Sequence, residues 1–303
     1  MSTDMNKNNE QAVQTNLDQD GILTITFDMP GRSANVLNDE LSDGFTAAVA
    51  EIENNTDVKG AILTSAKKDF LVGADIDKVF AIEKPEEAMT LADDFKAMLR
   101  RIELSGKPVV AALNGSALGG GYELAMACHH RIALNEPRIQ VGLPEAKLGL
   151  LPGGGGTQRL PRMIGIQKAL PLLLEGKSLR PDKALSSKLV DELAESRDEL
   201  LSKAKAWCLA NPSAKQPWDV KGFRFPGGDS KHPAIAQLWA IAPSMTNAKT
   251  QDNFPVVIDI MSCVFEGGLV DFDTALSVES RYFAHAATSQ TAKHFLVSVK
   301  CIK

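Results

Sequence analysis

The stretch Asn114-Gly115-Ser116-Ala117-Leu118-Gly119-Gly120-Gly121-Tyr122-Glu123 is the part of the sequence that decides the fold. A second stretch begins at Leu143-Pro144-Glu145 and ends at Pro152-Gly153-Gly154-Gly155-Gly156-Thr157. Each stretch contains one glutamate close to a run of consecutive glycines. Glycine lets a ligand approach main-chain N–H groups closely, and a carboxylate beside such a loop is placed to move protons on the ligand. The two stretches together predict an active site.

Strands and helices alternate in the residues that precede the first stretch. Alternating or continuous apolar residues predict strands over residues 22–27, 59–64 and 108–113, and helical spacing predicts helices over 41–52 and 91–102, the first capped by Asn38 or Asp39. This alternation indicates an α/β fold. Loops that leave the carboxyl ends of strands are the usual ligand sites of such folds, so we expect Ala74 and Gly120 to converge.

The sequence becomes helical after residue 157. Helical patterns cover residues 170–174, 192–209 and 255–299, and residues 211–233 between them are rich in proline and glycine. We therefore expect three parts: a disordered tail at 1–15, a core domain at 16–205, and a loop with a helical extension at 206–303.

Composition excludes several classes of protein. The net charge of -5 gives no general attraction to nucleic acid, and the four cysteines form no CxxC pair, so we expect no metal site. The polar, acidic start lacks the features of a secretion signal, and no apolar run is long enough to span a membrane. We expect a cytoplasmic protein without membrane insertion.

Taken singly, several of these residues also fit purely structural roles. Glu123 alone is accounted for by the dipole of a helix that begins there, and Glu145 alone by a salt bridge to Lys147 or Arg138. Asp75 and Asp77 fit helix caps. Nucleotide and hydrolase chemistry have little support, because neither glycine run completes a dinucleotide fingerprint and no Gly-x-Ser-x-Gly motif occurs.

Three segments, in order and spacing, resemble the signature segments of the enoyl-CoA hydratase/isomerase (crotonase) superfamily. They are Phe70-Leu71-Val72-Gly73-Ala74-Asp75-Ile76, Asn114 to Ala125, and Leu143 to Leu160. The resemblance implies a spiral of ββα units, followed here by a helical C-terminal region. It also implies that the substrate is an acyl-CoA thioester.

The resemblance assigns roles to individual residues. It implies that the backbone N–H groups of Ala74 and Gly120 form an oxyanion hole and that Glu123 and Glu145 are the catalytic carboxylates, the pair found in members that hydrate 2-trans-enoyl-CoA. The matching substrate-binding positions are Gly73, Asp75, Ile76, Gly119, Pro144 and Gly153. CoA enters as part of the substrate, and the resemblance implies no separate cofactor and no NAD site.

The C-terminal third resembles the region that follows the hydratase part of multifunctional fatty-acid β-oxidation proteins. The residues that carry this likeness are Gln216-Pro217-Trp218-Asp219 and Glu279-Ser280-Arg281-Tyr282-Phe283. We expect this chain to lack the dehydrogenase part of those proteins, and a thiolase partner and a homo-oligomer are further expectations. Two alternatives stay open: an enoyl-CoA isomerase or another acyl-CoA enolate reaction, and an inactive docking module of a β-oxidation complex.

Overall fold

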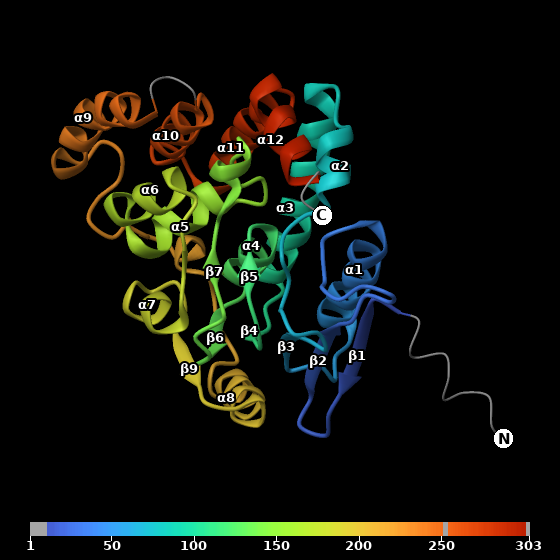
Figure 1. Cartoon of the computed structure of the whole chain (residues 1–303). Coiled ribbons are helices and arrows are strands. Elements are labelled where there is room, and N and C mark those ends of the chain that lie inside the picture. The colour runs from blue at the N-terminus through green and yellow to red at the C-terminus, as the bar shows by residue number, and fades with distance from the viewer. Residues whose placement is uncertain (1–10, 251–253, 301–303) are drawn as a thin grey trace. The chain divides into compact units, whose positions relative to one another are not determined.

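The computed structural model describes residues 11–250 and 254–300, which fall into two compact units. Unit 1 comprises the described residues of Met1–Asp75, Met98–Val141 and Leu179–Gln216. Unit 2 comprises those of Ile76–Ala97, Gly142–Ser178 and Pro217–Lys303. The predicted α/β class is confirmed, because strands and helices alternate through the first two-thirds of the chain and only helices follow (Figure 1).

The strands have the following bounds: β1 Val13–Leu17, β2 Ile22–Phe27, β3 Gly60–Ser65, β4 Val109–Leu113, β5 Ala117–Leu118, β6 His130–Leu134, β7 Val141–Gly142, β8 Ser178–Leu179 and β9 Glu192–Ala194. The helices are α1 Asp39–Asn54, α2 Ile76–Ala81, α3 Pro85–Leu104, α4 Gly120–Ala127, α5 Gly156–Ile164, α6 Ile166–Leu174, α7 Pro181–Ser186, α8 Arg197–Ala210, α9 Pro233–Thr250, α10 Val256–Gly267, α11 Phe272–Ala287 and α12 Gln290–Lys300. Short 3-10 helices cover Glu145–Leu148 and Pro217–Asp219.

A six-stranded sheet in the order β1-β2-β3-β4-β6-β9 forms the centre of unit 1. β1 pairs antiparallel with β2, and the other neighbours pair parallel. β3 and β4 are buried along their whole length, as expected for central strands of a parallel sheet that is covered on both faces. α1 begins at the predicted cap, where the side chain of Asn38 accepts a hydrogen bond from the Leu41 N–H.

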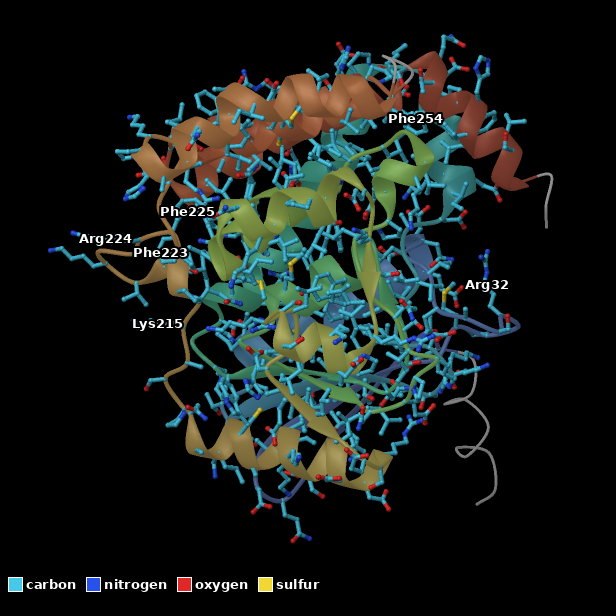
Figure 2. All side chains as sticks on the ribbon, turned by 60° about the vertical axis from the view of Figure 1, so that its left-hand side comes forward. Arg32, Lys215, Phe223, Arg224, Phe225 and Phe254 are labelled. Carbon is cyan, nitrogen blue, oxygen red and sulfur yellow. The ribbon has the colours of Figure 1, made fainter. Side chains whose placement is uncertain are left out.

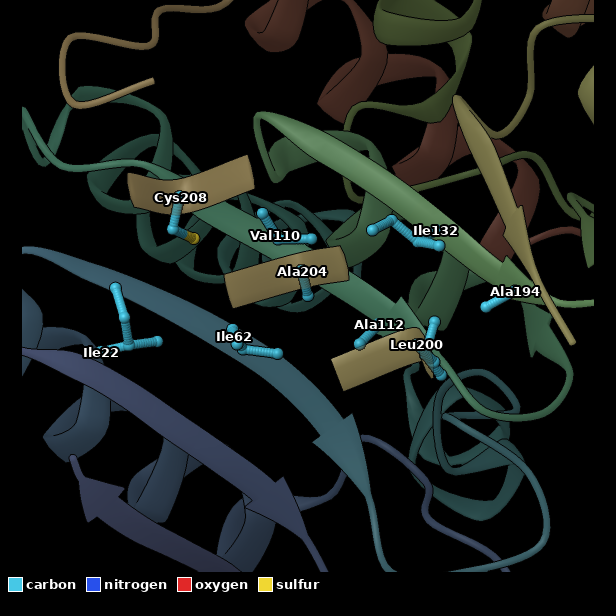
Figure 3. Packing of buried hydrophobic residues seen from close by; sticks show 9 residues of the cluster. All are labelled: Ile22, Ile62, Val110, Ala112, Ile132, Ala194, Leu200, Ala204 and Cys208. Atoms are coloured by element: carbon cyan, nitrogen blue, oxygen red, sulfur yellow. The ribbon is translucent and has the colours of Figure 1, made fainter. Parts of the chain in front are cut away.

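Helix α8 covers one face of this sheet (Figure 3). Its Leu200, Ala204 and Cys208 are buried against apolar residues of neighbouring strands, among them Ile62 and Val110. Such burial is worth about 1.5–3 kcal/mol for each large side chain. The cluster makes the sheet a rigid base for the loops that leave its strands.

Two of the predicted elements need correction. The tail predicted over residues 1–15 ends earlier than expected, because Val13–Leu17 form β1, whose backbone groups are satisfied by pairing with β2. Residues 1–10 lie outside the described part of the chain. The helix predicted from residue 192 begins only at Arg197, where Ser196 accepts a hydrogen bond from the Glu199 N–H, because Glu192–Ala194 pair with β6 as β9.

Helices dominate unit 2, where α10 packs on α5, α6 and α11. The proline- and glycine-rich loop is ordered: Trp218 lies 5.0 Å from Phe272 between ring centroids, and Phe225 lies under the Arg162 guanidinium at 4.7 Å. Between Phe223 and Phe225, the exposed Arg224 extends away from the ribbon (Figure 2).

The predicted boundary between a core at 16–205 and an extension at 206–303 does not coincide with the limits of these compact units. Unit 2 joins most of the predicted extension to two segments of the predicted core, Ile76–Ala97 and Gly142–Ser178. Hydrogen bonds between segments far apart in sequence hold unit 2 together. One example is the bond that Lys96 donates to the Leu276 carbonyl at 2.8 Å. The predicted limit between core and extension stays a prediction.

Candidate active site

The loop from Leu71 to Asp75 lies between two other segments of unit 1. On one side Leu71 pairs with Ala117 in a parallel bridge, and its carbonyl accepts a hydrogen bond from the Leu118 N–H at 3.1 Å. On the other side Ala74 pairs with Leu37, also in parallel. The loop is thus fixed along both edges by main-chain hydrogen bonds.

The peptide between Gly73 and Ala74 directs the Ala74 N–H away from Leu37. The Gly73 carbonyl accepts a hydrogen bond from the Leu37 N–H at 2.9 Å. Because the peptide bond that follows is trans, its N–H, which belongs to Ala74, points away from Leu37. Gly73 has φ = 97°, a conformation that side-chain-bearing residues rarely adopt. Ala74 itself is exposed.

Helix α4 begins directly beside this loop. Gly119 precedes the helix with φ = 56°, and a Cβ at Gly121 would lie 2.1 Å from the Leu71 carbonyl oxygen. The predicted convergence of Ala74 and Gly120 stays a prediction. In the described part of the chain, neither the Ala74 nor the Gly120 N–H donates a hydrogen bond. The Gly120 N–H thus lies at the amino end of a helix, whose dipole favours negative charge there.

Glu123 lies in the first turn of α4 and is only 2% exposed. The neighbours that surround it on the helix are glycine, alanine, leucine, methionine and Tyr122, all of them buried. Its main chain continues the same structure, since the Glu123 N–H donates to the Gly119 carbonyl at 2.9 Å. Unit 1 thus places a buried carboxylate one turn after the Gly120 N–H.

Unit 2 carries Glu145 in the 3-10 helix that follows Pro144. Glu145 and Pro144 are half-buried, and the turn closes where the Leu150 N–H donates to the Glu145 carbonyl at 3.1 Å. Gly149 ends the turn with φ = 70° and touches α12: a Cβ there would lie 3.1 Å from the Cα of Ala292. The C-terminal helices therefore hold the turn that carries Glu145.

The glycine-rich loop after Glu145 is held by the same helices. A Cβ at the predicted site residue Gly153 would lie 2.9 Å from the Phe283 ring on α11. Glu279, also on α11, accepts hydrogen bonds from the Gly155 N–H at 2.5 Å, the Thr157 N–H at 2.9 Å and the Thr157 hydroxyl at 2.5 Å. Glu279 thereby caps the amino end of α5. The sequence indicates only the C-terminal likeness of the Glu279 segment and carries no local signal of this contact.

Glu279 is fully buried, and its charge is balanced by Lys96 on α3. The Lys96 ammonium lies 3.9 Å from the carboxylate and is itself 3% exposed. Burial raises the pKa of Glu279, whereas the Lys96 charge and the donors of Thr157 and Gly155 act to lower it. Breaking such a pair by removing one partner leaves an uncompensated buried charge.

The remaining predicted residues take simpler positions. Asp75 ends the loop of unit 1, where its N–H donates to the Leu37 carbonyl at 3.0 Å and its carboxylate lies 3.7 Å from Arg32. Arg32 is exposed and extends from the ribbon (Figure 2). Ile76 is half-buried at the start of α2. Asp77 lies in the first turn of α2, as expected for a capping role.

The described residues contain neither a candidate metal site nor a candidate membrane-spanning helix. Within residues 11–250 and 254–300, no group of three or more His, Cys, Asp or Glu side chains is arranged to hold a metal ion. No helix in that same part of the chain is both long and apolar enough to cross a membrane.

Comparison with known proteins identifies the class. Residues 18–217 match the enoyl-CoA hydratase/isomerase family, and the chain belongs to this family. The chain is 38% identical over 286 residues to the fatty acid oxidation complex subunit alpha of Shewanella amazonensis, an alignment that covers 90% of this chain and 39% of the relative. The corresponding subunit of Shewanella halifaxensis is 39% identical over 274 residues, covering 89% and 38%. The chain therefore spans about two-fifths of the length of these relatives.

Solved structures agree on the fold. The enoyl-CoA hydratase of Bacillus halodurans superposes with a TM-score of 0.67 at 23% identity, over 95% of this chain and 100% of that chain. At this identity the likeness shows the fold alone. The predicted crotonase fold and the predicted likeness to multifunctional fatty-acid oxidation proteins are confirmed. The roles predicted for individual site residues stay predictions.

Proposed function

We propose that the protein is an enoyl-CoA hydratase, which adds water to 2-trans-enoyl-CoA to give 3-hydroxyacyl-CoA. The observation that supports the proposal is in unit 1, where the buried carboxylate of Glu123 lies one turn after the Gly120 N–H, at the start of a helix that packs against the loop after Leu71. Membership of the enoyl-CoA hydratase/isomerase family supplies the class of substrate.

The N–H groups of Ala74 and Gly120 are proposed to hold the thioester oxygen of the substrate. When water attacks C3, negative charge moves onto this oxygen as an enolate forms. Main-chain donors that are already oriented stabilise this charge without reorganisation, and one such donor is worth about 3–4 kcal/mol of barrier. The helix dipole of α4 acts in the same direction.

The two glutamates are proposed to handle the water and the proton. Glu123 activates the water for attack at C3, and Glu145 helps to position the water and delivers the proton to C2. Possession of both carboxylates favours hydration over isomerisation, because members of the family with one glutamate are usually isomerases or catalyse other enolate reactions. The burial of Glu123 supports its role, since general-base catalysis needs a carboxylate held in a fixed position beside the substrate.

A place in fatty-acid oxidation follows from the relatives. The Shewanella proteins are named as subunits of a fatty acid oxidation complex. We therefore expect the substrates here to be fatty acyl derivatives. The product, a 3-hydroxyacyl thioester, is the substrate of an oxidation at C3 and then of thiolytic cleavage, so a dehydrogenase and a thiolase are the proposed partners.

The test follows the loss of enoyl-thioester absorbance with crotonyl-CoA and a longer 2-enoyl-CoA. We expect Glu123→Gln and Glu145→Gln each to lower kcat by several orders of magnitude while acyl-CoA still binds. If activity survives in one variant, isomerase chemistry with a single base replaces the proposal. A folded wild-type protein that binds acyl-CoA without turnover would indicate the docking module instead.

A further inference from the structure

We propose that Asn35 is a positioning residue that sets the direction of the Ala74 N–H. The inference rests on the proposed function and adds to it a residue that touches neither substrate nor reacting atoms. Asn35 is 0% exposed and lies in the segment between β2 and α1. No motif of the family resemblance includes it.

The side chain of Asn35 joins the ends of two strands to the start of the loop. Its Oδ1 accepts a hydrogen bond from the Met29 N–H at 3.0 Å, just after β2. Its Nδ2 donates to the Ser65 hydroxyl at 2.8 Å, at the end of β3, and lies 3.1 Å from the Phe70 carbonyl. A carboxamide supplies both an acceptor and donors, a combination that aspartate and leucine of similar size lack.

Ser65 extends this network further into the loop. Its hydroxyl, which accepts from Asn35, donates to the Asp69 carbonyl at 2.7 Å and also accepts from the Lys67 N–H at 2.9 Å. The turn between β3 and Phe70 is thus closed around one buried hydroxyl. Asn35 fixes that hydroxyl from the side opposite the turn.

The main chain of the same segment then orients the peptide that precedes Ala74. The Asn35 carbonyl accepts from the Val72 N–H at 3.1 Å, and two residues later the Leu37 N–H donates to the Gly73 carbonyl at 2.9 Å. The second bond determines where the Ala74 N–H points, because the two groups lie on opposite sides of one trans peptide. The side chain of Asn35 anchors the segment that makes this bond.

Loss of the Asn35 carboxamide would release residues 35–37 from the strand ends. The Gly73–Ala74 peptide, which contains a glycine with little intrinsic preference for one conformation, would then rotate more freely. A donor that is no longer fixed toward the thioester oxygen stabilises the developing charge less, since preorganisation is the source of the effect. Binding of the CoA portion does not depend on this donor.

The experiment measures the polarisation of a bound thioester directly. A 4-(dimethylamino)cinnamoyl-CoA probe absorbs at longer wavelength when its carbonyl oxygen is held by hydrogen-bond donors, and this shift does not require turnover. The whole chain is compared as wild type, Asn35→Ala, Asn35→Asp and Ser65→Ala. Asn38→Ala serves as the matched control, because Asn38 caps α1 by accepting from the Leu41 N–H and its side chain makes no hydrogen bond to the loop among the described residues.

We expect the bound probe to lose most of its red shift in both Asn35 variants and part of it in Ser65→Ala. The kcat for hydration should fall about tenfold to a hundredfold with KM nearly unchanged, somewhat less than for outright loss of one donor. Asn38→Ala should keep the wild-type red shift and kcat.

A folded Asn35 variant with the full red shift would overturn the inference. If neither Asn35 variant folds, Ser65→Ala decides: a reduced shift supports the inference, and an unchanged shift overturns it. A wild-type protein that binds the probe with no red shift and hydrates no enoyl-CoA would refute the proposed function itself, an outcome distinct from failure of the inference alone.

Discussion

The loop that ends at Ala74 and the loop that carries Glu145 are both fixed by contacts with buried side chains. The two loops differ in whether those side chains are neutral or charged. In unit 1 the support is neutral: the carboxamide of Asn35 and main-chain hydrogen bonds fix the loop. In unit 2 the support is ionic, since the loop ends on the carboxylate of Glu279, which is paired with the buried Lys96. Substitutions of the supporting side chains should therefore have different consequences for the two loops.

Neutral hydrogen bonds contribute modestly and separately, about 0.5–1.5 kcal/mol each. Their loss changes the direction of a peptide more readily than it unfolds the unit. A buried ion pair behaves otherwise, because removal of one partner leaves the other charge in a medium that cannot solvate it. Substitution of Asn35, which supports the loop of Ala74, should thus lower activity more than stability. Substitution of Glu279 or Lys96, which support the loop of Glu145, should lower stability more than activity.

The largest effect is expected from Glu279→Ala. The substitution removes the buried counterion of Lys96, which keeps only the exposed Asp93 at 3.6 Å, and it removes the acceptor for the Gly155 and Thr157 N–H groups. We expect the free energy of unfolding to fall by about 3–5 kcal/mol, measured by urea unfolding followed by circular dichroism.

Glu266→Ala is the matched control for this loss. Glu266 lies on the neighbouring helix α10, where its exposed carboxylate accepts from the Tyr282 hydroxyl at 2.6 Å and lies 3.6 Å from Arg281. Its removal should cost less than about 1 kcal/mol. Equal losses for Glu279→Ala and Glu266→Ala would remove the distinction between a buried ionic support and a surface pair.

A smaller effect on stability, with a large effect on catalysis, is expected from Gly73→Ala. The space beside Gly73 is open, since the nearest atom to an added Cβ is the Leu118 carbonyl oxygen at 3.6 Å, so the cost arises from φ = 97° alone. We expect a loss of about 1–2 kcal/mol in stability. We also expect a fall of roughly a hundredfold in kcat/KM, because the peptide before Ala74 relaxes by rotating.

Gly31→Ala separates the two effects. Gly31 has φ = 66° with no atom within 4 Å of an added Cβ, and it lies in an exposed turn after β2. The same backbone strain should appear there as a similar loss of stability with unchanged kcat/KM. If both alanine variants kept full activity, the conformation of Gly73 would have no part in orienting the donor.

Local patterns were sufficient to predict much of unit 1. The helix over 41–52 and its cap at Asn38 follow from spacing within a few residues, and α1 confirms them. β9 was missed because Glu192–Ala194 become a strand only by pairing with β6, a contact that no short window contains. β1 was missed because its residues are mostly polar and its backbone is satisfied by β2 alone.

In the candidate site too, contacts between residues far apart in sequence could not be predicted. Glycine motifs beside Glu123 and Glu145 are local, so the sequence predicted them. Asn35 acts on Phe70, 35 residues away, and Glu279 acts on Thr157, 122 residues away. One signal was present: Glu279, like Glu123, lies on a buried stretch of helix. That signal identifies a buried carboxylate but does not distinguish a catalytic group from a support.

The smallest effect is expected where unit 1 has an ion pair of its own, on its surface. Arg101 on α3 donates to Glu53 on α1 from Nε at 3.0 Å and from Nη2 at 2.6 Å, and these hydrogen bonds raise the pKa of Arg101. Both side chains remain about one-third exposed, so water and salt screen the pair. We expect Glu53→Gln to lower the free energy of unfolding by about 0.2–1 kcal/mol, and the loss to shrink further at high salt.

Glu51→Gln on the same helix is the control for that last measurement, since Glu51 has no ion pair among the described residues. Any effect common to both variants reflects helix charge and not the contact with Arg101. A loss above about 3 kcal/mol for Glu53→Gln alone would place this surface pair on the scale of the buried pair of Lys96 and Glu279. The contrast between a neutrally supported unit 1 and an ionically supported unit 2 would then have to be abandoned, because geometry and not burial would set the strength of both pairs.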